Sequence, residues 1–146
     1  MKMLPEDTKA WLSEFDYPDY TTSIRGRQHV TRKQLGELGI SPDSEIADFY
    51  LNHGALSATG WYELLEPGEL GDVADYIHSA FGLPEHFIAL TNHEGGGFSL
   101  LDRQSMFIYD IIFDPLDDLI GGLVAPVAES FAGYLEWRRR QRTNRG

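Results

Sequence analysis

Apolar residues recur at helical spacing in several stretches of the chain. The clearest stripe has members at i, i+3, i+4 and i+7, namely Ile46, Phe49, Tyr50 and His53. It predicts a helix over residues 42–53 with one buried face. Ser41 can cap its exposed amides, Pro42 suits its first turn, and Gly54 suits the position just after its end.

Weaker stripes predict further helices over residues 5–15, 31–38 and 72–81, and a last one opened by Pro126. In the helix over residues 72–81 the predicted apolar side is formed by Val73, Tyr76, Ile77 and Ala80. The basic, polar residues 24–33 show neither a helical period nor the alternation of a strand clearly, so the sequence is compatible with either an edge strand or a loop there.

Short apolar runs bounded by turn residues predict strands over residues 61–65, 87–90, 98–101 and 106–113. The last three follow one another so closely that they predict an antiparallel meander. Helices, a strand, a helix, a meander and a final helix indicate an α+β fold with helices packed around an antiparallel or mixed sheet. The length predicts a single domain over residues 1–140, followed by a basic tail over residues 141–146.

Charge is distributed very unevenly along the chain. Between Gln34 and Trp137 there are eighteen carboxylates and one cation, Arg103, whereas the net charge of the whole chain is −11. Most other cations gather in two clusters: Arg25, Arg27, Arg32 and Lys33, and Arg138, Arg139, Arg140, Arg142 and Arg145. A body this acidic repels nucleic acid and anionic lipid and attracts a basic protein, although acidic surfaces also serve simply to keep proteins dispersed.

Several segments, in order, resemble the SUKH superfamily. They are residues 42–46 with 52–54, residues 63–70, the strand 87–90, the Gly-rich turn and strand 94–102, residues 107–109, and the closing helix 130–136. The resemblance covers roughly residues 35–140 and implies an α+β fold. Bacterial members are mostly immunity proteins that bind and neutralise polymorphic secreted toxins, often nucleases, whereas fungal relatives are cell-wall regulators and interaction scaffolds. The family has no shared catalytic residues to carry over, and it does not account for the two cation clusters.

Other chemistries find little support in the residue spacing. The glycines Gly95, Gly96 and Gly97 lead into an apolar strand with no Lys after them, so a tight turn is a better interpretation than a phosphate loop. The five His residues lack any recognised metal-ligand spacing, and no Ser carries nucleophile-elbow glycines. We therefore expect no catalytic residues, no metal and no cofactor, with an enzyme as a remote alternative.

An exposed aromatic set among carboxylates would form an interface anchor. The predicted partner-binding residues are Trp61, Glu94, Asp102, Tyr109, Asp114, Asp117 and Asp118. The hypothesis is an immunity protein that binds a basic toxin domain, and the alternative is a regulatory or scaffold interaction module. The N-terminus lacks the apolar core of a signal peptide, Cys is absent, and no apolar stretch is long enough to span a bilayer. We therefore expect a cytoplasmic protein that binds neither membrane nor nucleic acid.

Overall fold

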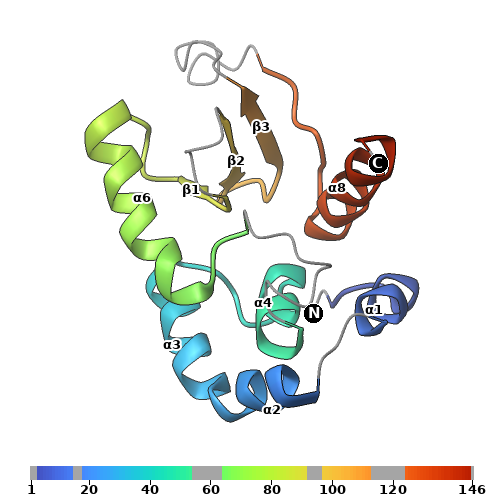
Figure 1. The fold of residues 1–146 in the computed structure, drawn as a ribbon. Helices are drawn as coiled ribbons and strands as arrows, with labels where there is room; N and C mark the ends of the chain where they lie inside the picture. The colour runs from blue at the N-terminus through green and yellow to red at the C-terminus, as the bar shows by residue number, and fades with distance from the viewer. Residues whose placement is uncertain (1–2, 15–17, 54–63, 92–96, 113–123, 146) are drawn as a thin grey trace. The chain divides into compact units, whose positions relative to one another are not determined.

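The computed structural model describes residues 3–14, 18–53, 64–91, 97–112 and 124–145. Within these ranges the chain forms six helices and a three-stranded antiparallel sheet, which confirms the predicted α+β class (Figure 1). The elements are α1 (Glu6–Ser13), α2 (Pro18–Gly26), α3 (Gln28–Glu37), α4 (Glu45–Asn52), α6 (Pro67–Phe81), β1 (Phe87–Ala89), β2 (Gly97–Asp102), β3 (Ile108–Ile112) and α8 (Phe131–Arg145). Contacts divide the chain into two compact units, Met1–Glu69 and Leu70–Gly146, and the single domain over residues 1–140 stays a prediction.

The first unit is built around α4. The Ser44 hydroxyl caps this helix by accepting the Ala47 amide at 3.2 Å, so the helix begins at Glu45 rather than at residue 42. The predicted stripe is correct, since Ile46, Phe49 and Tyr50 are all buried. α4 contacts both α2 and α3, and its Tyr50 hydroxyl donates to the Leu65 carbonyl at 2.8 Å.

Residues 24–33 are helical, so neither the edge strand nor the loop considered for them is correct. They form the end of α2 and the first turns of α3. α3 buries Thr31 and Leu35, four residues apart, so the helix predicted over residues 31–38 is present but begins three residues earlier, at Gln28. The polar residues before Thr31 gave no helical period of their own, and they are helical as the first turn of α3 and the end of α2.

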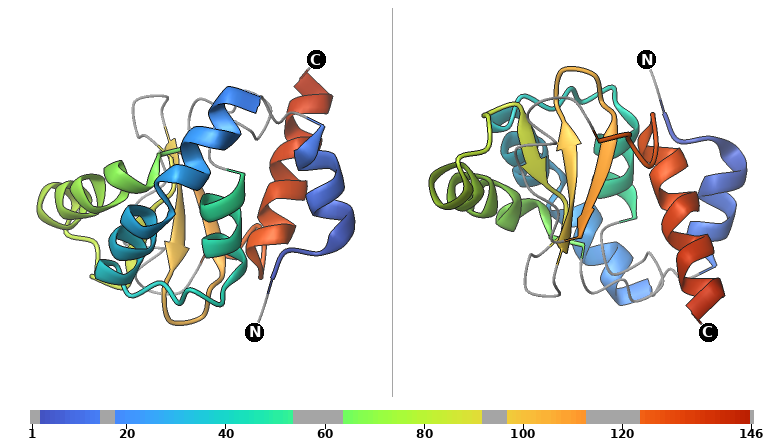
Figure 2. Two further views of the ribbon diagram at one scale, coloured as in Figure 1. Left: turned by 90° about the horizontal axis from the view of Figure 1, so that it is seen from below. Right: turned by 90° about the horizontal axis from the view of Figure 1, so that it is seen from above.

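The second unit contains the sheet. β2 lies between β1 and β3, with Ile88 opposite Leu101 and Leu100 opposite Tyr109, which confirms the meander. Two views show α6 beside the β1 edge of the sheet and α8 beside the β3 edge (Figure 2).

Of the predicted strand over residues 61–65, only Leu64 and Leu65 lie within the described residues, and both are buried.

The last helix begins at Phe131 and not at Pro126, because Val127 and Ala128 hydrogen-bond to Ile108 instead of forming a helical turn. The Val127 amide donates to the Ile108 carbonyl at 2.8 Å, and the Ile108 amide donates to the Ala128 carbonyl at 2.9 Å. This bridge extends the pairing at β3 and prevents a helical turn there. The Ser130 hydroxyl then accepts the Gly133 amide at 3.0 Å, at the first turn of α8.

The helix predicted over residues 72–81 begins five residues earlier, at Pro67, and buries a different face. Leu70, Ala74 and Ile77 are buried at i, i+4 and i+7. Tyr76 and Ala80, which the prediction placed on the apolar side, are exposed. Once Leu70 joins the helix, the buried stripe rotates and leaves Tyr76 facing solvent.

Candidate functional site

Two of the seven predicted partner-binding residues, Asp102 and Tyr109, lie in described parts of the chain. The other five, Trp61, Glu94, Asp114, Asp117 and Asp118, lie outside the described residues. The structure places Asp102 at the end of β2 and Tyr109 in β3, and it brings them to the same face of the sheet. Phe87 connects them, because it pairs with Asp102 across β1 and β2 and its ring meets the Tyr109 ring edge-on at 6.1 Å.

Asp102 has a local structural role. Its Oδ1 accepts the amides of Gln104 at 2.8 Å and of Ser105 at 3.4 Å, which closes the turn between β2 and β3. Within the same turn Met106 has a φ of 66°, and its amide donates to the Asp102 carbonyl at 2.7 Å. Asp102 and Tyr109 are each half-buried, so they present only part of their surface to a partner.

A more exposed aromatic and acidic surface lies on α6. Asp72, Asp75 and Tyr76 fall at i, i+3 and i+4, so they share one face of the helix, and all three are exposed. The Tyr76 side chain is 48% exposed and Phe81 is 39% exposed, and their rings meet edge-on with centroids 5.9 Å apart. We call Asp72, Asp75, Tyr76 and Phe81 the α6 surface.

The α6 surface lies on the exposed side of a helix whose other side is buried. Leu70, Ala74 and Ile77 anchor its opposite face in the core. A ring nitrogen of His78 lies 3.0 Å from the Phe87 carbonyl, which ties the helix to β1. Gly82 ends the helix in the left-handed conformation, with a φ of 68°, and its amide donates to the His78 carbonyl at 3.1 Å.

The α6 surface was not predicted from the sequence, because the helical pattern over residues 72–81 placed Tyr76 on the buried face. The signal that would have found it is the pair Pro67 and Leu70. Pro67 suits the first turn of a helix, and the Glu69 carboxylate accepts the Glu66 amide at 3.0 Å, as in the reciprocal half of a capping box. A helix begun at residue 67 has a buried stripe through Leu70 and Ile77, which turns Tyr76 outward.

A buried polar cluster joins α8 to the sheet in the second unit. The Ser99 hydroxyl donates to Asp110 Oδ1 at 3.0 Å, and Arg138 donates to the Tyr134 hydroxyl at 3.1 Å. Tyr134 is also hydrogen-bonded to Ser99, and the Arg138 guanidinium lies 5.7 Å from the Tyr134 ring centroid. Burial is the main cause that raises the pKa of the Tyr134 phenol above its ordinary value of 10.0, while Arg138 opposes the rise.

This cluster positions α8 and is not accessible to a substrate. The Ser99 and Tyr134 side chains are both buried, so no external molecule reaches either hydroxyl. A buried tyrosine hydroxyl normally finds partners, and here Ser99 and Arg138 provide them. The cluster therefore acts in specifying how α8 packs on β2 and β3.

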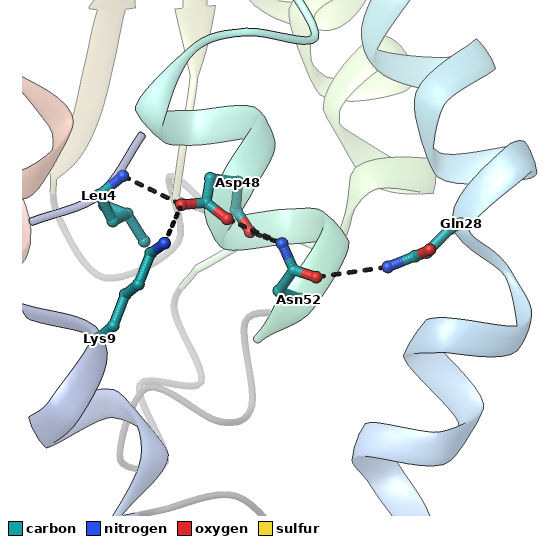
Figure 3. A network of polar contacts seen from close by, with 5 residues as sticks. All are labelled: Leu4, Lys9, Gln28, Asp48 and Asn52. Atoms are coloured by element: carbon teal, nitrogen blue, oxygen red, sulfur yellow. Dashed lines mark hydrogen bonds and ion pairs between the residues drawn. The ribbon is translucent and has the colours of Figure 1, made fainter. Parts of the chain in front are cut away.

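The first unit holds a polar network centred on Asp48, which is 2% exposed (Figure 3). Asp48 Oδ2 accepts the Leu4 amide at 3.0 Å and lies 3.5 Å from the Lys9 ammonium, while Oδ1 accepts the Asn52 side-chain amide at 2.7 Å. Gln28 of α3 extends the network by donating to the Leu51 carbonyl at 2.9 Å and to Asn52 at 3.4 Å. One carboxylate thereby ties the N-terminal segment and α1 to α4.

Metal-binding and membrane-spanning features are not found in the described part of the chain. No three His, Asp or Glu side chains there come close enough together to hold a metal ion. Within the same residues, no helix has both the length and the apolar character needed to cross a bilayer. Compared with family models, with curated proteins and with solved structures, the chain matches none.

Proposed function

We propose that this protein is a protein-binding module that binds a basic partner protein through the α6 surface. The observation that carries the proposal is the exposed Tyr76–Phe81 pair beside Asp72 and Asp75. Aromatic residues dominate the energetics of protein interfaces, and surrounding carboxylates accelerate association with a positively charged partner. The net charge of −11 favours the same kind of partner at longer range.

The resemblance to the SUKH superfamily suggests what the partner is. In that family the bacterial members neutralise secreted toxins, many of which are nucleases with basic, phosphate-binding sites. We therefore propose that the protein is a cytoplasmic immunity protein, in which Asp72 and Asp75 occupy the place of phosphates in the toxin and Tyr76 supplies packing. The regulatory or scaffold module remains the second candidate, since the same surface would serve an endogenous basic partner.

Affinity capture with matched variants tests the binding proposal. The tagged wild-type chain is incubated with lysate from its source cell at low salt and then eluted with a salt gradient. We expect a basic protein that binds the wild type but not a Tyr76→Ala, Phe81→Ala double variant, because truncating hot-spot aromatics costs about 2 kcal/mol or more, roughly 30-fold in affinity. A Met3→Ala variant is the control, since Met3 is similarly exposed, at 41%, but lies in the first unit.

A second double variant separates the effect of the α6 carboxylates on the association rate from the effect of the aromatic contacts on affinity. Asp72→Asn with Asp75→Asn should slow association at low salt and change dissociation little, because exposed charges act mainly on the association rate. As the control, Asp43→Asn with Glu129→Gln removes two other carboxylates that are also exposed. Equal capture by wild type and both α6 variants would contradict the binding proposal.

Co-expression then decides between the immunity and regulatory candidates. The toxic domain of a captured secreted protein is expressed with and without this chain, and growth is measured. Restored growth with the wild type, but not with the Tyr76→Ala, Phe81→Ala variant, supports immunity. A captured partner that is harmless alone, together with a deletion phenotype in the absence of any competitor, supports the regulatory module.

A further inference from the structure

The cations of α2 and α3 form a second exposed surface with the opposite charge. Arg25 lies in the last turn of α2, Arg27 caps α3, and Arg32 and Lys33 follow within α3, and all four side chains are exposed. Val30 lies among them and is 41% exposed. We call Arg25, Arg27, Val30, Arg32 and Lys33 the basic surface.

The four cations of the basic surface differ from other described cations in their pairing. Elsewhere in the described chain cations pair with carboxylates, as Lys9 does with Asp48 at 3.5 Å and Arg139 with Glu136 at 3.7 Å. No described carboxylate lies within ion-pairing distance of the four cations of the basic surface. Residues 20–36 contain no Asp or Glu, so the cluster has no local counter-charge along the chain either.

We infer that the basic surface binds the α6 surface of a second copy of this protein. On α3, His29, Arg32 and Lys33 fall at i, i+3 and i+4, the same spacing that Asp72, Asp75 and Tyr76 have on α6. Each helix thus presents a ridge of one charge sign, and each ridge carries an exposed apolar neighbour, Val30 on α3 and Tyr76 on α6. Pairing the two ridges neutralises both charges and covers both apolar side chains.

A second copy fits this surface better than nucleic acid does. A long polyanion would extend beyond the short α3 helix and meet a chain whose net charge is −11. The opposing α6 surface carries only two carboxylates beside an aromatic pair, which matches a small basic patch containing an aliphatic residue. Contact between two different surfaces is head-to-tail, so it can add further copies beyond a dimer.

The contact has a characteristic dependence on salt. At roughly 0.01 M ionic strength charges interact over about 30 Å, so the net negative charge of each copy keeps the copies apart. At roughly 0.15 M the range falls to about 8 Å, and only the complementary ridges interact. At roughly 1 M the ridges are screened as well. Association is therefore strongest at intermediate salt, whereas an apolar contact would strengthen steadily with salt.

The contact goes beyond the proposed function and has a consequence for it. A second copy seated on the α6 surface covers Tyr76, so self-association competes with a basic partner for the same residues. Exposed ion pairs are individually weak, so the contact is reversible and yields to a partner of higher charge. At high protein concentration, the α6 surface would therefore be covered by a second copy of the chain.

Sedimentation equilibrium of the purified full-length chain tests the inference with no partner present. We expect the average mass to rise above 16.5 kDa between about 10 µM and about 1 mM protein, the range in which weak complexes form. Asp72→Lys with Asp75→Lys, and separately Arg32→Glu with Lys33→Glu, should each weaken association at least about tenfold, because each creates like-charge contacts. Asp43→Lys with Glu129→Lys is the control for altered net charge.

Mixing the two reversed variants is the decisive step. At a concentration where the wild type associates, each variant alone should stay close to 16.5 kDa, and an equimolar mixture should associate, because the lysines on α6 of one variant meet the glutamates on α3 of the other. A wild type that remains monomeric over the whole range, association that survives both reversals, or a mixture that fails to associate would each overturn the inference. Since no partner is present, any of these outcomes leaves the proposed function to its own test.

Discussion

The Asp48 network allows a quantitative prediction about the stability of the first unit. Asp48→Ala removes the carboxylate that accepts the Leu4 amide at 3.0 Å and the Asn52 amide at 2.7 Å and that pairs with Lys9 at 3.5 Å. The Leu4 amide is buried with its acceptor, so the substitution leaves it without a hydrogen bond. We expect the N-terminal segment to separate from α4 more readily than it does in the wild type.

The magnitude follows from the individual contacts. Hydrogen bonds to a charged group contribute about 1.5–3 kcal/mol each, and the one from Leu4 is lost outright. Asn52 retains a bond of 3.2 Å to the Asp48 backbone carbonyl, so its loss is smaller. The Lys9 side chain is 30% exposed, so its ion pair adds less than about 1 kcal/mol. Together these contacts predict that Asp48→Ala lowers the free energy of unfolding by about 3 kcal/mol.

Urea denaturation followed by circular dichroism measures this difference, with two matched variants. Lys9→Met keeps the aliphatic stem of the side chain and removes only the ion pair, so it should cost less than about 1 kcal/mol. Asp43→Ala removes an exposed carboxylate just before α4 and should lie within about 0.5 kcal/mol of the wild type. Hydrogen exchange at the Leu4 amide should be slow in the wild type and in Asp43→Ala and fast in Asp48→Ala.

Two results would refute this reasoning. If Asp48→Ala costs less than about 1 kcal/mol, the hydrogen bonds to the carboxylate do not offset its desolvation. If Lys9→Met costs as much as Asp48→Ala, the ion pair and not the amide contacts holds the N-terminal segment. An unchanged exchange rate at Leu4 in Asp48→Ala would show that the segment is held by apolar contacts of α1.

Three further predictions concern single substitutions in the second unit. The pKa of Tyr134 is raised, so above about pH 10 the unfolded chain loses the phenol proton while the folded chain keeps it, and the free energy of unfolding decreases as pH rises. Denaturation at pH 8 and at pH 10.5 should show a smaller decrease for Tyr134→Phe than for the wild type. Gly82→Ala should lower the unfolding free energy by about 1 kcal/mol, because a Cβ there meets nothing within 4 Å and only the φ of 68° opposes it. Gly71→Ala lies within α6, where a Cβ also meets nothing within 4 Å, and it should instead raise the unfolding free energy by about 0.5–1 kcal/mol. Thermal melts in which both glycine variants change stability in the same direction would contradict this account.

Strong local patterns in the sequence were sufficient to predict much of the fold. The meander was predicted from three short apolar runs, because the connections between them are too short for a crossover, and the observed β1, β2 and β3 lie within one to two residues of the predicted bounds. The α4 stripe was predicted because its apolar residues form an unbroken helical period. The uneven distribution of charge along the chain also follows directly from the order of the residues in the sequence.

Tertiary contacts decided the elements whose local pattern was weak. The helices α2 and α3 run through residues 24–33, where Ile24 and Thr31 are buried, and only the part of α3 from Thr31 onward lay within a predicted helix. The start of α8 moved from Pro126 to Phe131 because residues 127 and 128 pair with Ile108, a contact about twenty residues distant along the chain. Such pairing overrides a proline that would otherwise suit a first helical turn.

The candidate site shows the same division. The acidic character of the chain and its aromatic content follow from the sequence alone, because both depend on composition. Which aromatics are exposed depends on which helix face reaches the core, and for Tyr76 the burial of Leu70, Ala74 and Ile77 decided it. The contact of Asp48 with Leu4 and that of Tyr134 with Ser99 were equally inaccessible to pattern analysis, since each joins residues far apart in sequence that only the folded chain brings together.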